Sequence, residues 1–282
     1  MGARSIDRIS VTSSIVTYRS DPELLRRLVE SLLAAIEKAR EVFDLRTEII
    51  FVINDDRPSE TEQVCGLAGI FAGRPNDRFS IIRGHGNVGY GTGQNKALDR
   101  LGSDYHLILN PDVVVDEMAI LESIQYLDSH EEAVMVTPQG YDPADNYAHL
   151  SKRRPTVLAL MLRWFAVQAS DSTFCGRCIA RYTYADELPA EQPFEVFLAS
   201  GCFMFCRTEA FRAVRGFNEA YFLYFEDYDL SLRLAEYGGI VEIPNARITH
   251  YGGRTGRRGV RRALYFVRSG WRFFNQHGWS VY

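Results

Sequence analysis

Three carboxylates lie within four residues of one another in the stretch Phe222–Arg233, whose sequence is FLYFEDYDLSLR. They belong to Glu226, Asp227 and Asp229, and aromatic residues surround them. A carboxylate in partly apolar surroundings has a raised pKa, which suits it to act as a general base. From these residues alone a structural interpretation is equally open, in which Asp229 caps a helix that starts near it and pairs with Arg233 one turn later.

A fourth carboxylate, Asp112, lies in the turn Asn110-Pro111-Asp112, directly after the apolar run His106–Leu109. Hard divalent cations take oxygen ligands, commonly one or two carboxylates together with substrate phosphates. The same three residues also have a common turn composition. Because open α/β sheets bind ligands beyond the carboxyl ends of their strands, the position of Asp112 favours a ligand or metal site.

Glycines recur between residues 84 and 93, beginning with Gly84-His-Gly-Asn-Val-Gly89. This stretch matches the dinucleotide pattern G-x-G-x-x-G, but it follows the third predicted strand rather than the first. In addition, no acidic residue ends a strand about twenty positions later in the expected way. Gly91 and Gly93 continue the series. We interpret it as a loop whose backbone approaches a nucleotide phosphate or sugar, with the N-terminus of the next helix facing the anion. Nicotinamide or flavin binding has only this pattern in its support.

Strands and helices are expected to alternate through the first half of the chain, and they must position these residues. Apolar and β-branched runs predict strands at 9–17, 48–53, 79–82, 105–109 and 133–136, and later at 195–207 and 239–243. Asp21-Pro22-Glu23 is expected to start a helix, with Asp21 as its cap and Pro22 at its first position, and other helices are expected near 60–69, 93–101 and 116–128. Such alternation predicts a mostly parallel sheet with helices on both faces. The apolar run 157–167 is too short to span a membrane and predicts a core, lid or interfacial helix.

Composition and charge narrow the class of protein. The 282 residues are 46% apolar and 24% charged, which is typical of a globular protein with a full core. The sequence shows no bilayer-spanning run and no signal peptide, so a cytoplasmic location is expected. Five cysteines without framework spacing agree with a reducing compartment. The net charge of −4 hides an asymmetry, because the segment from His250 to Tyr282 has seven arginines and no acidic residue.

The arginines of this C-terminal segment alternate with apolar and aromatic residues, among them Leu264, Trp271 and Trp279. The composition predicts peripheral contact with an anionic membrane surface, here the inner face of the cytoplasmic membrane. A helix that packs its aromatic side chains on the core and leaves its arginines in water explains the pattern equally well. Nucleic-acid binding is disfavoured, because the body of the chain is acidic and no recognition motif is present.

An ordered set of short stretches resembles the family-2 glycosyltransferases of the GT-A fold, and within them the bacterial rhamnosyltransferases that use dTDP-L-rhamnose. The stretches are Thr17-Tyr18, Asn54-Asp55-Asp56, Gly89–Asn95, Asn110–Asp112, Ala199–Cys202, Gly216–Glu219 and Phe225–Leu230. The resemblance implies an α/β GT-A fold with a Rossmann-like, mostly parallel central sheet flanked by helices. It also implies a glycosyltransferase domain over 1–253, with a nucleotide-sugar half to about 137 and an acceptor half over about 138–253. A basic, amphipathic, helical tail over 254–282 would follow.

The resemblance also implies roles for individual residues. Asp227 matches the family's catalytic base and Glu226 its partner carboxylate. Asp112 and His250 match metal-binding positions, although Asn110 stands where the family's D-x-D motif has its first acidic residue. The residues that match nucleotide-sugar contacts are Thr17, Tyr18, Arg19, Asn54, Asp55, Gly89, Gly91, Asn95, Asn110, Asp112 and Gly201.

The activity implied by the resemblance is inverting transfer of L-rhamnose from dTDP-L-rhamnose to a hydroxyl of a cell-envelope glycan or lipid-linked acceptor, such as O-antigen or lipopolysaccharide core. Mg²⁺ or Mn²⁺ would be the cofactor. Three alternatives stay open from the residues: a UDP-sugar donor, a non-catalytic nucleotide-sugar-binding relative, and a nicotinamide-dependent oxidoreductase. The retention of Asp112, Glu226, Asp227 and His250 together argues against the non-catalytic alternative.

Overall fold

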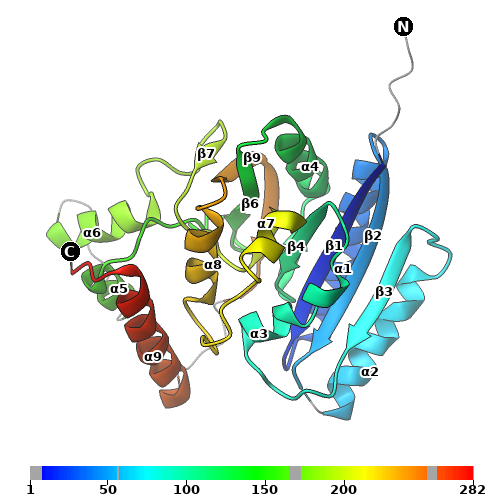
Figure 1. Ribbon diagram of the computed structural model, residues 1–282, viewed down its shortest axis with the longest axis horizontal. Helices are drawn as coiled ribbons and strands as arrows, with labels where there is room; N and C mark the ends of the chain where they lie inside the picture. The colour runs from blue at the N-terminus through cyan, green and yellow to red at the C-terminus, as the bar shows by residue number, and fades with distance from the viewer. Residues whose placement is uncertain (1–7, 56, 165–172, 253–258, 282) are drawn as a thin grey trace, which may run out of the picture.

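The computed structural model describes residues 8–55, 57–164, 173–252 and 259–281 (Figure 1). Asp56, the predicted boundary at 253, the tail arginines 254, 257 and 258, and the end of the apolar run 157–167 lie outside these ranges. The strands are β1 (Arg8–Thr17), β2 (Asp44–Ile53), β3 (Asp77–Ile82), β4 (Tyr105–Leu109), β5 (Val113–Val115), β6 (Ala133–Tyr141), β7 (Phe194–Glu195), β8 (Phe203–Arg207) and β9 (Gly239–His250). The α-helices are α1 (Pro22–Arg40), α2 (Pro58–Gly66), α3 (Tyr90–Asn95), α4 (Ala119–Ser129), α5 (Val157–Trp164), α6 (Phe174–Thr183), α7 (Thr208–Ala213), α8 (Glu226–Leu234) and α9 (Val260–His277).

One sheet joins the described strands in the order β3-β2-β1-β4-β8-β6-β9-β5, with β7 paired to β9. The predicted alternation of strands and helices is confirmed, and β3, β2, β1 and β4 are parallel as expected. Beyond β4 the sheet is mixed, because β8 pairs antiparallel with both β4 and β6, and only the β6–β9 pair is parallel. Apolar runs predict that a strand exists but not its direction, so the sequence did not reveal this change.

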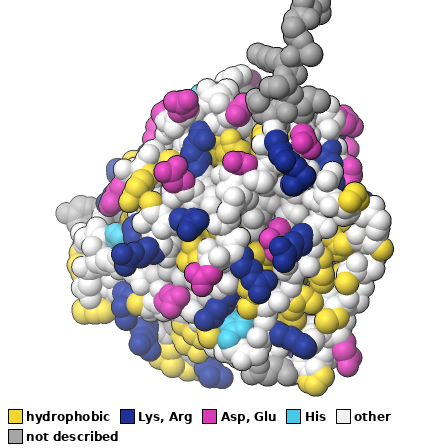
Figure 2. All heavy atoms as spheres, turned by 45° about the vertical axis from the view of Figure 1, so that its right-hand side comes forward, with side chains coloured by type: hydrophobic (Ala, Val, Ile, Leu, Met, Phe, Trp, Pro, Cys, Tyr) yellow, Lys and Arg dark blue, Asp and Glu magenta, His cyan; other side chains and the backbone are white. Residues whose placement is uncertain are grey.

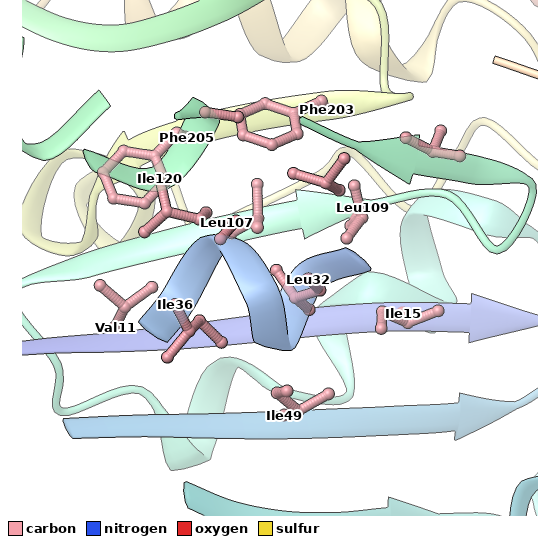
Figure 3. Close-up of a cluster of buried hydrophobic side chains, with 14 of the residues drawn as sticks. Val11, Ile15, Leu32, Ile36, Ile49, Leu107, Leu109, Ile120, Phe203 and Phe205 are labelled. Carbon is pink, nitrogen blue, oxygen red and sulfur yellow. The ribbon is translucent and has the colours of Figure 1, made fainter. Parts of the chain in front are cut away.

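Helix α1 covers one face of the sheet because its apolar residues recur at helical spacing. Asp21 caps it by accepting hydrogen bonds from the backbone N–H groups of Glu23 and Leu24, as predicted. Figure 3 shows Leu32 and Ile36 of α1 among side chains from β1, β2, β4 and β8. Along β4 and β8, successive residues alternate between this cluster and a second one on the opposite face, as the strand period requires.

Helices α5, α6 and α9 lie together at the left of Figure 1, on the far side of α8 from β2 and β3. They share a third apolar cluster, in which Phe273 and Phe274 of α9 are buried with Phe225 and Leu160. The tail helix therefore packs on the core with its inner face, while its other face stays exposed. Among the described residues, no helix is both long and apolar enough to cross a membrane.

Charge is mixed over the surface that Figure 2 shows. Lysine and arginine side chains lie among aspartate and glutamate side chains across that face, rather than in a single-signed field. Interspersed charges of this kind favour solubility but steer no particular ligand. On this face, any ligand would therefore be recognised by individual sites rather than by an extended field of one charge.

Candidate active site

The carboxyl ends of β1, β2 and β4 meet at one edge of the sheet, where the sequence-predicted residues gather. Thr17 ends β1, and its carbonyl accepts a hydrogen bond from the backbone N–H of Asn54 at 2.9 Å. The Asn54 side chain in turn donates to the Gly89 carbonyl at 2.7 Å. Asn110 follows β4 at the same edge. The segments that were expected to surround a ligand thus lie together at the carboxyl ends of these strands.

Asp112 and His250 are brought together by strand register. Strands β5 and β9 are antiparallel and pair Val113 with His250, which puts Asp112 beside the imidazole. Asp112 Oδ1 lies 3.4 Å from His250 Nε2. This oxygen is buried and has no hydrogen-bond partner within the described part of the chain. A buried carboxylate oxygen without a partner is costly in a finished structure and is suited to a cation.

Gly252 completes this corner by leaving room. A Cβ atom at position 252 would lie 2.4 Å from His250 Nε2 and 2.6 Å from Asp112 Oδ2. Burial by itself would lower the pKa of His250, but the neighbouring Cys202 sulfur and the Asp112 carboxylate outweigh it and raise the pKa to about 10. The structure's described residues contain no cluster of three or more His, Cys, Asp or Glu side chains that could hold a metal ion on its own. A metal cation at Asp112 and His250 would therefore have to displace the His250 proton, and it would also need oxygens from a bound ligand or water.

The turn Ser200–Gly201–Cys202 links this corner to the acidic pair of α8. The Gly201 N–H donates to Asp227 Oδ2 at 3.2 Å. The next residue, Cys202, has its sulfur 3.5 Å from His250 Nε2 and accepts from the Asn110 N–H through its carbonyl at 3.0 Å. Asp227 and Asp112, which lie far apart in the sequence, are therefore linked through Gly201, Cys202 and His250.

Asp227 and Glu226 sit in the first turn of α8 and have different surroundings. Burial raises the pKa of Asp227 to about 6, although backbone N–H groups of Gly201 and Tyr228 bind its carboxylate and oppose the rise. Burial and the negative charge of Asp227 raise the pKa of Glu226 well above its usual range. Glu226 Oε2 lacks a hydrogen-bond partner among the residues described. Burial and mutual repulsion therefore favour one negative charge rather than two on this pair.

The prediction that the helix starts near Asp229 is wrong, because α8 begins three residues earlier, at Glu226. Asp229 is not a cap. It is fully buried inside the helix, where it binds Arg233 at 2.8 Å and accepts from Gln276 and His277 of α9 at 2.9 and 2.8 Å. The predicted Asp229–Arg233 pair is confirmed. Of the three clustered carboxylates, Asp229 therefore joins two helices rather than facing the crevice.

The start of α8 is set by an unusual backbone. Tyr224 and Phe225 both have positive φ angles, 69° and 67°, which non-glycine residues rarely adopt. Phe225 packs against Phe266 and Phe273 of α9, with ring centroids 5.2 and 5.4 Å away. Strained backbone persists where the surrounding packing holds it, and it concentrates at functional sites. Helix α9 thus helps to fix where Glu226 and Asp227 lie, a role that the sequence did not indicate.

A buried chain of hydrogen-bonded polar side chains holds the turn Ser200–Gly201–Cys202, and the sequence analysis did not predict it. Tyr90 donates to the Gly201 carbonyl at 2.7 Å and accepts from Gln94 at 3.0 Å. Ser14 donates to Gln94 at 2.5 Å and lies 3.0 Å from His106 Nε2. Burial lowers the pKa of His106 to about 3, so its imidazole is neutral. Ser14 and His106 gave a sequence signal as polar residues inside strands that otherwise read as apolar, whereas Tyr90 and Gln94 lie in α3.

The predicted nucleoside residues lie near one another beyond β1 and β2. Tyr18 is 46% exposed, and the Arg19 guanidinium lies 5.3 Å from the centre of its ring. Arg19 also lies 4.0 Å from the Asp55 carboxylate, which binds Arg57 more closely, at 2.6 Å. Burial would raise the pKa of Asp55, but its bonds to Arg57 outweigh this and lower it. The exposed aromatic ring is available for contact with a ligand, whereas the Asp55 carboxylate is 9% exposed and already bound to Arg57.

The glycine-rich loop has packing partners that the sequence did not predict. Cβ atoms would collide with Phe222 at Gly89, with Phe217 at Gly91, and with Asn54 and Val16 at Gly93. The Tyr90 N–H donates to the Phe222 carbonyl at 3.1 Å, so this N–H at the start of α3 does not face an anion as expected.

Asn95 is also engaged by protein, because its amide exchanges two 2.8 Å hydrogen bonds with the Phe217 backbone. These contacts dock the loop onto the segment that leads into α8. The predicted donor contacts of Gly89, Gly91 and Asn95 stay predictions.

Comparisons with known proteins identify the family of the chain and its fold. The model of the family Glycosyl transferase family 2 matches residues 14–215, and that of the N-terminal domain of galactosyltransferase matches residues 190–253. An N-acetylglucosaminyl-diphospho-decaprenol L-rhamnosyltransferase of Mycobacterium tuberculosis is 28% identical over 179 residues, which are 58% of this chain and 56% of the relative. Rhamnosyltransferase WbbL of Escherichia coli is 30% identical over 149 residues, which are 52% of each chain. The chain thus spans about half the length of the curated relatives it matches.

Solved structures of low sequence identity share the fold. GalNAc-T7 with UDP, GalNAc and Mn²⁺ aligns with a TM-score of 0.63 at 10% identity, over 94% of this chain and 48% of that one. The mannosyltransferase PcManGT of Pyrobaculum calidifontis, in complex with GDP-Man and Mn²⁺, aligns with a TM-score of 0.62 at 12% identity, over 95% and 65% of the two chains.

Proposed function

Because the chain belongs to glycosyl transferase family 2, we propose that it moves L-rhamnose from dTDP-L-rhamnose to a hydroxyl of a lipid-linked or cell-envelope glycan acceptor. The predicted family, the GT-A fold class and the assignment as a glycosyltransferase are confirmed. The choice of donor is supported by the two relatives that are rhamnosyltransferases. The choice of acceptor is supported by the mycobacterial relative, whose acceptor is a sugar on a diphospho-decaprenol.

The observation that carries the proposal is the turn Ser200–Gly201–Cys202. Through Gly201 it holds a carboxylate of raised pKa, and through Cys202 it touches His250, which lies beside Asp112. A transferase that displaces a nucleoside diphosphate needs a base for the incoming hydroxyl and positive charge for the departing diphosphate. This short turn fixes the position of the proposed base, Asp227, relative to the proposed cation site at Asp112 and His250.

Asp227 is proposed to take the proton from the acceptor hydroxyl as its oxygen attacks the anomeric carbon. Its raised pKa makes the proton transfer favourable while leaving most of the carboxylate ionised at neutral pH. The two backbone N–H groups on the carboxylate orient it towards one position. Glu226, protonated and buried beside it, adds no second negative charge to repel the diphosphate.

Asp112 and His250 are proposed to hold Mg²⁺ or Mn²⁺ together with oxygens of the donor diphosphate. The unpartnered Asp112 Oδ1 and the space kept by Gly252 fit such an ion. When bound, the ion would neutralise charge on the departing dTDP. The nucleotide sugar is proposed to contact Thr17, Tyr18, Arg19, Asn54, Asp55, Gly89, Gly91, Asn95, Asn110, Asp112 and Gly201.

Donor and metal are expected to stabilise the protein together. At a dTDP concentration about 100 times Kd, binding adds about 2.7 kcal/mol to the free energy of unfolding, which raises Tm by several degrees. We expect a Mn²⁺-dependent rise with dTDP, a smaller rise with UDP and none with NADH, measured by differential scanning fluorimetry. Asp112→Asn should remove the Mn²⁺-dependent part, while Asp128→Asn on the exposed surface of α4 should keep it. A larger rise with UDP would replace the proposed donor, and no rise with either nucleotide would contradict the proposed function.

Helix α9 is proposed to contact the membrane through its outer face. Val260, Leu264, Val267 and Trp271 are 63–78% exposed and recur every three or four residues, so they form one apolar stripe. Arg261 and Arg268 lie beside it, exposed. Exposed apolar residues flanked by cations are typical of helices that lie on anionic membranes. This contact would place the enzyme at the inner face of the cytoplasmic membrane, near a lipid-linked acceptor.

Flotation with lipid vesicles tests this contact. Deleting α9 would be uninformative, because its inner face is buried against Phe225 and binds Asp229. The double variant Val260→Gln/Leu264→Gln changes only exposed side chains and should weaken binding to phosphatidylglycerol vesicles at least about tenfold, through lost apolar burial. Val42→Gln/Tyr237→Gln, which changes exposed apolar residues elsewhere, is the matched control. Equal flotation of both variants and the native chain would exclude the stripe as the contact.

A further inference from the structure

An apolar groove of about 360 Å³ runs between α5 and α9. All the residues that line it are apolar or glycine, and they include Leu160 and Met161 of α5, Val267 and Trp271 of α9, and Trp279. Met161, Val267, Trp271 and Trp279 are each at least half exposed. Large apolar side chains that face an open groove are costly in water and mark a binding surface.

A second pocket, of about 340 Å³, adjoins the groove and is basic. Neighbouring residues of the same two segments line both cavities: Thr156 and Ser280 the basic pocket, Val157 and Trp279 the groove. The Val157 N–H donates to the Ser280 carbonyl at 2.9 Å, which fixes the C-terminal segment beside the start of α5. The two cavities are thus lined by consecutive residues at the start of α5 and at positions 279 and 280.

Of the three arginines that line the basic pocket, Arg154 and Arg181 are not paired with an acidic side chain of the described residues. Arg153 is already bound through two hydrogen bonds, of 2.6 and 2.7 Å, to Glu187. Arg154 and Arg181 are exposed, and no acidic side chain of the described residues lies within ion-pair distance of either. Two unneutralised guanidinium groups lining one pocket suit a phosphate or diphosphate, which arginine binds in a bidentate manner.

Contacting side chains also link the basic pocket to the proposed base. Tyr182 lines the pocket, and its hydroxyl lies 2.5 Å from the hydroxyl of Tyr228. Tyr228 directly follows Asp227 in α8, and its N–H binds the Asp227 carboxylate. The groove, the basic pocket and the proposed base are thus linked through shared segments and contacting side chains. This linkage suits a molecule that carries a long apolar chain, then an anion, then a hydroxyl-bearing sugar.

We infer that the α5–α9 groove and the pocket with Arg154 and Arg181 together form the binding site for a polyprenyl-diphosphate-linked acceptor. The groove takes the first isoprene units, and Arg154 and Arg181 take the diphosphate. The attached sugar then reaches towards Asp227. This inference rests on the proposed glycosyl transfer, whose acceptor it specifies, but it can be tested without nucleotide or metal.

Tryptophan fluorescence of the full chain provides the test, because Trp271 and Trp279, two of its three tryptophans, line the groove. Farnesyl diphosphate is the probe, and farnesol and inorganic diphosphate supply its two halves separately. Farnesyl diphosphate is expected to bind at least about tenfold more tightly than either half, because apolar and charged contacts then act together. Binding no tighter than farnesol would overturn the inferred anion site, and binding no tighter than inorganic diphosphate would overturn the groove.

Variants separate the two parts of the site. Arg154→Gln/Arg181→Gln should weaken farnesyl diphosphate at least about tenfold and leave farnesol unchanged, whereas Ala263→Phe, which fills the groove, should weaken both. Arg78→Gln/Arg100→Gln removes the same charge from a different pocket and should change neither. An arginine double variant that binds farnesyl diphosphate normally would overturn the inference. A failed dTDP thermal shift would contradict the donor proposal without affecting this titration, so the two failures are distinguishable.

Discussion

Asp227→Asn is expected to lower kcat about 10³-fold while the protein still folds and binds dTDP. General-base catalysis contributes about 10²–10⁴ to rate, and the amide cannot accept the proton from the acceptor hydroxyl. Asn has the same shape, and its amide oxygen can still accept from the Gly201 N–H. The measurement is steady-state transfer from dTDP-L-rhamnose, with dTDP-induced stabilisation as the check on donor binding.

The pH dependence gives this prediction a second readout. A base acts only when it is deprotonated, and the pKa of Asp227 is raised to about 6. As pH falls below 6, the ionised fraction falls tenfold per unit, so kcat/KM of the native enzyme should decline with a slope approaching one. Above about pH 7 the carboxylate is ionised and this dependence should vanish. The residual activity of Asp227→Asn should lack the acidic decline.

Glu226→Gln is the contrasting variant. Because the pKa of Glu226 is raised well above its usual range, Gln replaces a neutral carboxyl by a neutral amide of the same size. We expect a loss of less than about tenfold, far smaller than that at Asp227, since no charge changes. If Asp227→Asn retained native turnover, or if Glu226→Gln were the more damaging change, the base would have to be assigned elsewhere.

Gly252→Ala is expected to lower kcat/KM about 100-fold without unfolding the protein, because a displacement of about 1 Å at a catalytic group costs that much. The new methyl group would lie 2.4 Å from His250 Nε2 and 2.6 Å from Asp112 Oδ2. Both atoms are at the ends of side chains, so they can swing away, and the strain is relieved by pulling the pair apart. The Mn²⁺ concentration for half-maximal activity should rise at the same time.

Gly102→Ala is the matched control for this substitution. A Cβ atom at Gly102 would meet nothing within 4 Å, and its backbone is not in the left-handed region. It should retain native kcat/KM and native Mn²⁺ dependence. Native behaviour of Gly252→Ala in both measurements would mean that Asp112 and His250 need not act together, and the proposed metal site would fall.

Several features could be predicted because they depend on near neighbours in the chain. The Asp21 cap and the apolar stripe of α1 follow from residues within a few turns of each other. The parallel direction of β1, β2 and β4, which brings their carboxyl ends together, follows from alternating strands and helices. The ordered motifs identified the family, and with it Asp227 and Asp112 as candidates.

The acidic cluster shows where local reasoning fails. Glu226, Asp227 and Asp229 have similar chemistry, and spacing alone does not say which of them faces the crevice. The answer depends on α9, which binds Asp229 through Gln276 and His277 and packs on Phe225. The two interpretations of the tail, packing on the core and contact with a membrane, do not exclude each other, because one face of α9 is buried and the other is exposed.

By itself, the sequence determined the alternation of elements, the start of α1, and the candidates for the base, its partner carboxylate and the metal-binding residues. Only the tertiary structure decided which of these residues meet. His250 reaches Asp112 because β9 pairs antiparallel with β5 in one register, and Asp227 reaches the same corner because Gly201 and Cys202 are adjacent. Propensities and caps act between residues a few positions apart, whereas strand order, direction and register set the distances between residues far apart in the chain.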